Sequence, residues 1–136
     1  MPDAFWESTD AKVYDSPSAG MDSGDEMTVV NDGVIEAYPI LIFTAVDANQ
    51  NFTLLNTTTG GVLTIGSNAF VPGTTITVDC QNGTVYLSDG ISRAEISSAM
   101  ADNTGYPFFQ PGGNVLRYDS AFWAIGLHVE FRERSV

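Results

Sequence analysis

From Met27 onward, the sequence alternates between short apolar runs and clusters of turn-forming residues, and this pattern constrains the fold more than any other feature. Short runs at such spacing predict antiparallel β-strands that form a sandwich or a barrel. Only the stretch SRAEISSAMADN (92–103) is compatible with a helical turn. The strand-like runs are MTVVN (27–31), YPILIFTAV (38–46), FTLLN (52–56), VLTIG (62–66), NVLRYDS (114–120) and AFWAIGLHVEFRE (121–133).

The last of these runs has strict period-two alternation. One face is apolar and the other is polar or small, which is typical of an antiparallel strand buried on one side only. The apolar face carries Trp123, Ile125, Leu127, Val129 and Phe131, and the other face carries Gly126, His128, Glu130 and Arg132.

Two further apolar-alternating runs flank Asn82-Gly83 within TTITVDCQNGTVYLSDG (74–90). A two-residue type I′ turn at this pair would place Cys80 opposite Val85. Ile76, Val78 and Cys80 would then share one apolar face with Val85 and Leu87. Cys80 is therefore expected to serve as a small hydrophobic residue in the core.

Catalytic and metal-binding patterns are not evident. A reactive cysteine needs a nearby base, and nothing in the sequence brings the single His128 to the single Cys80. One cysteine also excludes an internal disulfide. The stretch DANQN (47–51) begins like a calcium loop but lacks its glycine and distal glutamate, so a polar turn is expected. We expect no catalytic residue, no metal site, no cofactor and no enzymatic activity.

The charge balance limits the possible partners. The net charge is −12, from 17 acidic and 5 basic residues, which argues against binding to nucleic acid or to an anionic membrane. No apolar run is long enough for membrane insertion. The N-terminus lacks the pattern of a signal peptide, so synthesis in the cytoplasm is expected.

Residues 1–26 differ in composition from the rest of the chain. They hold seven acidic residues and one lysine, which predicts an extended acidic arm (1–26) before a β-sandwich domain (27–136). Phe5 and Trp6 in this arm pack either on their own domain or on a neighbouring subunit. Deleting the arm should leave a folded sandwich that assembles poorly.

Basic residues concentrate in the second half of the chain, and Arg132 and Arg134 lie close to its end. Two interpretations are open: ordinary pairing within the chain, or head-to-tail contact between the arm of one copy and the basic edge of the next. The candidate interface residues are Phe5, Trp6, Arg132 and Arg134.

Four segments, in this order, resemble the C-terminal domain of the phage distal tail protein family: VVNDGVIEAYPILIF (29–43), GTTITVDCQNGTVYLSDG (73–90), YPFFQPGGNVLRY (106–118) and LHVEFRERSV (127–136). The resemblance implies a jelly-roll or galectin-like sandwich in the virion tail of a long-tailed phage, assembled in the host cytoplasm. It also implies a structural protein without catalytic residues, located near the baseplate.

Members of that family commonly form a hexameric ring, so a trimeric or hexameric homo-oligomer is expected here. Tail-tube, tail-hub and receptor-binding proteins are the expected partners. The family's usual N-terminal domain forms the ring, and here a 26-residue arm stands in its place. The resemblance therefore implies a reduced form or a separate subunit that decorates or caps a ring made by others.

A carbohydrate-binding module for host-surface attachment is the alternative, because the same architecture often binds sugars. That function would need solvent-facing aromatic rings. Tyr86, Tyr106 and Phe109 are the candidate platform, and Tyr86 points away from the apolar face of the predicted hairpin.

Overall fold

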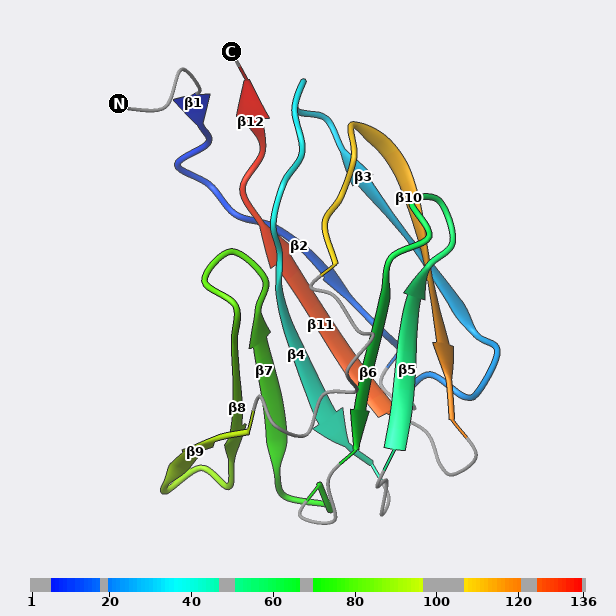
Figure 1. Ribbon diagram of the computed structural model, residues 1–136, viewed down its shortest axis with the longest axis vertical. Coiled ribbons are helices and arrows are strands. Elements are labelled where there is room, and N and C mark those ends of the chain that lie inside the picture. Colours follow the sequence, from blue (N-terminus) through cyan, green and yellow to red (C-terminus); the bar gives the residue numbers. More distant parts are fainter. Residues whose placement is uncertain are drawn as a thin grey trace.

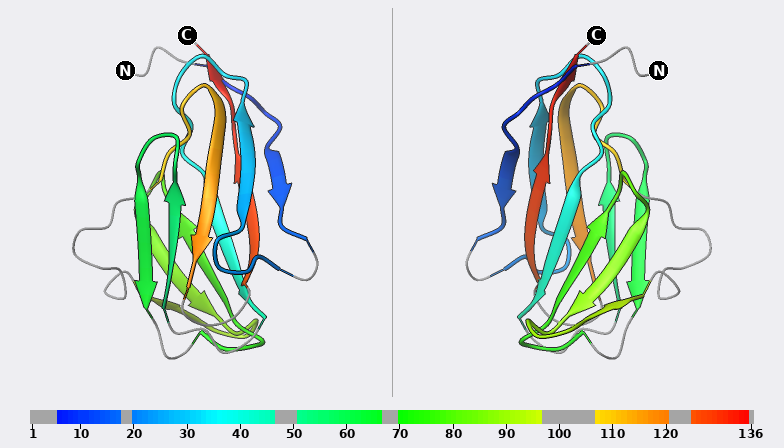
Figure 2. Two further views of the ribbon diagram at one scale, coloured as in Figure 1. Left: turned by 90° about the vertical axis from the view of Figure 1, so that its right-hand side faces the viewer. Right: turned by 90° about the vertical axis from the view of Figure 1, so that its left-hand side faces the viewer.

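The computed structural model of the protein is an antiparallel β-sandwich, which confirms the predicted fold class (Figure 1). It describes residues 6–17, 20–46, 51–66, 70–96, 107–120 and 125–135. In the left view of Figure 2 the four-stranded sheet faces the viewer, and in the right view the six-stranded sheet does. No helix is assigned in these ranges, and none there could cross a membrane.

The strands and their spatial order are as follows. The six-stranded sheet has the order β2 (Lys12–Asp15), β11 (Ile125–Phe131), β4 (Ile40–Ala45), β7 (Thr75–Asp79), β8 (Thr84–Ser88) and β9 (Arg93–Glu95). The four-stranded sheet has the order β3 (Glu26–Asn31), β10 (Gly112–Asp119), β5 (Asn51–Asn56) and β6 (Val62–Gly66). A short separate pair joins β1 (Trp6–Glu7) to β12 (Arg134–Ser135).

The core lies between the inner faces of the two sheets. An aromatic cluster is at its centre: the Phe52 ring lies 4.7 Å from Phe43, 5.6 Å from Phe70 and 6.2 Å from Tyr118, between ring centroids. All four side chains are buried, so together they remove a large apolar area from water. The alternation predicted for the last strand is confirmed over 125–131, where every second side chain is buried; Trp123 lies outside the described residues.

Three buried asparagines hold the loops at one end of the sandwich. Asn31 Nδ2 donates to the carbonyl oxygens of Ile35 and Phe109, at 3.1 Å each. Asn56 Nδ2 donates to Asn114 Oδ1 at 3.3 Å. Because buried amides are costly unless they are bonded, these contacts fix the loops that they bridge.

The β7–β8 hairpin confirms the predicted faces and corrects the predicted turn. Val78, and not Cys80, lies opposite Val85, so four residues connect the strands and the register is shifted by two. The Asp79 carboxylate causes the longer loop, because it accepts hydrogen bonds from the backbone nitrogens of Gln81 and Asn82, at 3.1 Å each. A shift of two keeps each side chain on its face, and Cys80 is buried as expected.

The structure also corrects the expected arm. Lys12–Asp15 forms the β2 edge of the six-stranded sheet, paired with β11. Met21 is 2% exposed and pairs through its backbone with Ile125. The acidic composition misled the prediction, because the acidic side chains point to solvent while the alternate ones pack inward. The described part of 1–26 is thus integral to the sandwich.

The predicted helical turn is wrong where it can be checked, because Arg93–Glu95 forms the edge strand β9, paired with β8. Pairing to the sheet here overrides local helix propensity. The region 47–50 of the polar turn lies outside the described residues, and Asn51 begins β5.

Candidate interaction surface

The N-terminal segment lies against the C-terminal strand, β12, and the residues just before it, and the two segments form a polar seam. Arg134 Nε bonds to Glu7 Oε2 at 3.1 Å, and Arg134 is only 9% exposed. Arg132 Nη1 donates to the carbonyl oxygens of Ser8, at 3.0 Å, and of Thr9. Both predicted interface arginines therefore engage their own chain, as in the interpretation of ordinary internal pairing.

Lys12 ties the same seam to the β3–β4 loop. Its ammonium lies 2.5 Å from Asp32 Oδ2 and 3.6 Å from Glu133 Oε2. The hydrogen bond to Asp32 raises the pKa of Lys12, although partial burial opposes the shift. Lys12 thus stays charged and holds three chain segments together.

A glycine allows the β3–β4 loop to approach the C-terminal strand closely. A Cβ atom on Gly33 would lie 2.5 Å from the carbonyl oxygen of Arg134 and 2.7 Å from its backbone nitrogen. The next residue, Val34, donates its backbone N–H to the same carbonyl at 2.8 Å. Any side chain at this position would push the C-terminal strand away.

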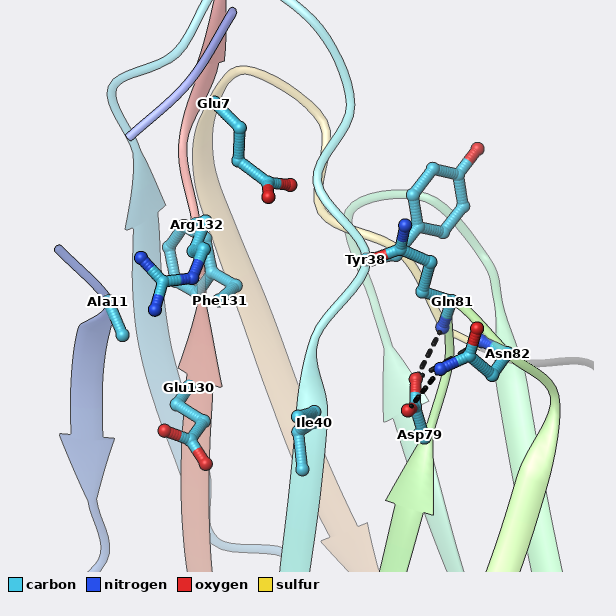
Figure 3. A pocket seen from close by; sticks show the side chains of 10 residues that line it. All are labelled: Glu7, Ala11, Tyr38, Ile40, Asp79, Gln81, Asn82, Glu130, Phe131 and Arg132. Atoms are coloured by element: carbon cyan, nitrogen blue, oxygen red, sulfur yellow. Dashed lines mark hydrogen bonds between the residues drawn. The ribbon is translucent and has the colours of Figure 1, made fainter. Parts of the chain in front are cut away.

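A groove of about 300 Å³ opens beside this seam (Figure 3). The seam is one wall, the β7–β8 loop is the opposite wall, and Ile40 of β4 lies between them. The charged groups at the groove are three carboxylates and one guanidinium. Its lining residues are Glu7, Ala11, Tyr38, Ile40, Asp79, Gln81, Asn82, Glu130, Phe131 and Arg132.

A second cavity of about 180 Å³ adjoins the first on the outer face of the six-stranded sheet. Ile40 and Asp79 line both cavities. The far wall contains Tyr86 and Arg93, whose guanidinium carbon lies 4.1 Å from the centre of the Tyr86 ring. This distance is within the range of a cation–π contact.

The structure does not assemble the predicted sugar-binding platform. Phe109 is fully buried, with its ring edge-on to Phe131 at 5.2 Å between centroids, which corrects the expectation that it faces solvent. Tyr86 does lie on the outer face, half-buried beneath Arg93. Phe5 and Tyr106 lie outside the described residues. For Trp6 only the backbone is described, and it pairs with Ser135.

The two side chains whose types are best suited to catalysis, Cys80 and His128, lie apart. Burial, with a smaller contribution from Asp79, raises the pKa of the Cys80 thiol far above its usual range, so Cys80 stays protonated and unreactive. His128 Nδ1 lies 2.6 Å from Asp15 Oδ1 on the outer face of the sheet. Within the described ranges, no group of three potential metal-binding side chains occurs.

Sequence reasoning missed the groove, because its walls come from segments far apart in the chain. The one available signal was the run YPILIFTAV, which is apolar without alternation and therefore indicates a strand with apolar side chains on both faces. β4 has this character, with Leu41 and Phe43 in the core and Ile40 and Ile42 half-buried on the outer face.

Comparisons with known proteins agree with this architecture. The crystal structure of SPP1 Dit, described as a paradigm of the hub adsorption apparatus in phages that infect Gram-positive bacteria, has a similar fold with a TM-score of 0.75 at 13% sequence identity. The match covers 98% of this chain and 50% of that one, so the chain spans half the length of that protein. The search of curated proteins returned no match.

The family comparison extends over most of the sandwich. Residues 32–134 match the model of the siphovirus-type tail component, C-terminal domain. This range begins just after β3 and runs to the start of β12, so it includes Ile40 and the β7–β8 wall of the groove, whereas Glu7 and Ala11 of the opposite wall lie before it. The chain therefore belongs to the family of siphovirus-type tail components.

Proposed function

We propose that this protein is a structural subunit of the distal tail, or baseplate region, of a long-tailed phage. The family match over residues 32–134 is the observation that carries this proposal. The fold shared with SPP1 Dit supports the distal position, since that protein is described as part of a hub adsorption apparatus.

The chemistry of the described residues suits a structural role without catalysis. Cys80 is buried and protonated, and His128 is held by Asp15 on the opposite side of the sheet. The ion pairs of Lys12 with Asp32 and of Arg134 with Glu7 use scarce basic side chains to join segments that are far apart in the chain. A rigid sandwich of this kind can present its loops and outer faces to other subunits.

Self-association into a trimer or hexamer is part of the proposal, as is contact with tail-tube, hub and receptor-binding proteins. Phe5 and Trp6 remain candidates for such contacts, and the backbone of Trp6 belongs to the β1–β12 pair at one end of the molecule (Figure 1). Arg132 and Arg134 contribute indirectly, by holding that end together. Assembly takes place in the host cytoplasm, before the virion is released.

The experiment that tests the proposal is inactivation of the gene in the phage that carries it, followed by electron microscopy of the particles. We expect particles with defective or missing tail tips, and a plasmid copy of the gene should restore them. Normal infectious virions without this protein would contradict the proposal. Light scattering of the purified protein measures self-association, with a discrete trimer or hexamer as the expected species.

A further inference from the structure

The outer face of the six-stranded sheet is not built like an ordinary solvent-exposed face. Its central strand β4 places Ile40 and Ile42 there, and both are only half-buried. In the register of the sheet, Ile40 lies between Glu130 and Asp79, and Ile42 lies between His128 and Thr77. Strands that are apolar on both sides are typical of sheets covered on both faces.

The two adjoining cavities form one trough across this face. It runs from the N-terminal segment over β11, β4, β7 and β8 to Arg93 of β9. Neighbouring strands are about 4.8 Å apart, so the part of the trough from β11 to β9 is roughly 19 Å long. An extended peptide rises about 3.3 Å per residue, so this length fits roughly six residues.

The charge of the trough favours a cationic occupant. Glu7, Asp79 and Glu130 line its first half, and Arg132 is turned to the carbonyl oxygens of the N-terminal segment. The Glu130 carboxylate is half-buried and makes no hydrogen bond or ion pair with another described residue. A lysine or arginine from a partner would supply the missing counter-charge beside the apolar Ile40.

A second copy of this chain is a poor source of that segment. The chain has only five basic residues, and each already contacts another residue of its own chain. Their contacts are Lys12 with Asp32, Arg93 with Tyr86, Arg117 with Asp119, Arg132 with the carbonyl oxygens of Ser8 and Thr9, and Arg134 with Glu7.

We propose that this trough binds an extended segment of a neighbouring tail protein, with Lys or Arg side chains alternating with apolar or small ones. The basic side chains pair with Glu130 and the carboxylates around it, and an apolar side chain packs on Ile40. The identity of the partner as a tail protein rests on the proposed function, whereas the binding chemistry rests on the trough itself.

The test uses the full-length protein and a fluorescein-labelled peptide, acetyl-Lys-Thr-Lys-Val-Lys-Thr-amide, with binding followed by fluorescence anisotropy at low salt. A peptide with Glu in place of Lys is the charge control. We expect the basic peptide to bind and the acidic one not to bind. Glu130→Gln should weaken binding about three- to fivefold, the range of a single partly exposed ion pair, and Glu130→Lys should abolish it.

Glu26→Gln is the matched control, because Glu26 is exposed on β3 of the other sheet and its substitution changes the net charge equally. It should leave binding unchanged. Equal weakening by Glu130→Gln and Glu26→Gln would assign the attraction to net charge alone and overturn the proposal. Absence of binding at wild-type protein concentrations up to about one millimolar would also overturn it.

Three further measurements separate the remaining outcomes: the oligomeric state, the fold of each variant, and the presence of the protein in virions. A wild-type oligomer that Glu130→Lys dissociates would assign the trough to a second copy and overturn the proposal. Circular dichroism of each variant shows whether the fold is intact. The presence of the protein in virion tails is measured separately, so loss of peptide binding leaves the proposed function standing, and absence from virions leaves the peptide result standing.

Discussion

Substitution of Gly33 by alanine tests how tightly the C-terminal strand is held against the rest of the sandwich. The new Cβ would lie 2.5 Å from the Arg134 carbonyl oxygen, and this neighbour is backbone, which cannot rotate away like a flexible side chain. The C-terminal strand must therefore shift. The shift would stretch the hydrogen bond from Val34 N to the same oxygen, which is now 2.8 Å long.

The expected magnitude follows from these two contributions. Overpacking of this kind costs about 1–3 kcal/mol, and weakening one backbone hydrogen bond adds about 1 kcal/mol. The free energy of unfolding should thus fall by roughly 2–4 kcal/mol. At this chain length each kcal/mol lowers Tm by roughly 2–6 °C, so a decrease of at least about 4 °C is expected.

Differential scanning calorimetry or urea unfolding measures this loss. Gly113→Ala is the matched control, because a Cβ there meets nothing within 4 Å. It should be neutral, or stabilise by about 0.4–1 kcal/mol through the unfolded state. Equal stability of the two variants would refute the close approach of the β3–β4 loop to the C-terminal strand.

Three further predictions concern the N-terminal segment and the core. Tyr14→Phe removes a hydroxyl that accepts a backbone N–H of β3 at 3.1 Å, so urea unfolding should show a loss of about 1 kcal/mol, whereas Tyr86→Phe should be neutral. Deleting residues 1–26 removes the edge strand β2 and the buried Met21, so unfolding should occur at a clearly lower urea midpoint or lose cooperativity; an unchanged midpoint would show that the segment is dispensable. Because burial raises the pKa of Cys80, iodoacetamide at pH 8.5 should leave the folded protein unmodified and alkylate it in urea; rapid reaction of the folded protein would contradict the buried position.

The alternating pattern was sufficient to predict most strands and their buried faces. Period two in the last strand placed Leu127 and Val129 in the core, and both are there. The same reasoning assigned the correct face to Cys80, because an error of two residues in register does not change the face.

Features that depend on single side chains or on distant segments could not be predicted in this way. The Asp79 carboxylate lengthens the hairpin loop by bonding to its backbone. The role of β2 was hidden by acidic composition, although its inward residue Tyr14 packs on Phe131 with parallel rings. The groove has Glu7 and Glu130 in its lining, and these residues come together only in the folded chain. The apolar run YPILIFTAV indicated one strand of this surface, but no local pattern could predict its walls.

Immunogold electron microscopy of purified virions, with antibody raised against this protein, tests whether the protein is a subunit of the distal tail. We expect gold at the distal end of the tail, and only there. Label on the capsid, or virions that carry no label while a known tail protein is labelled in parallel, would contradict it.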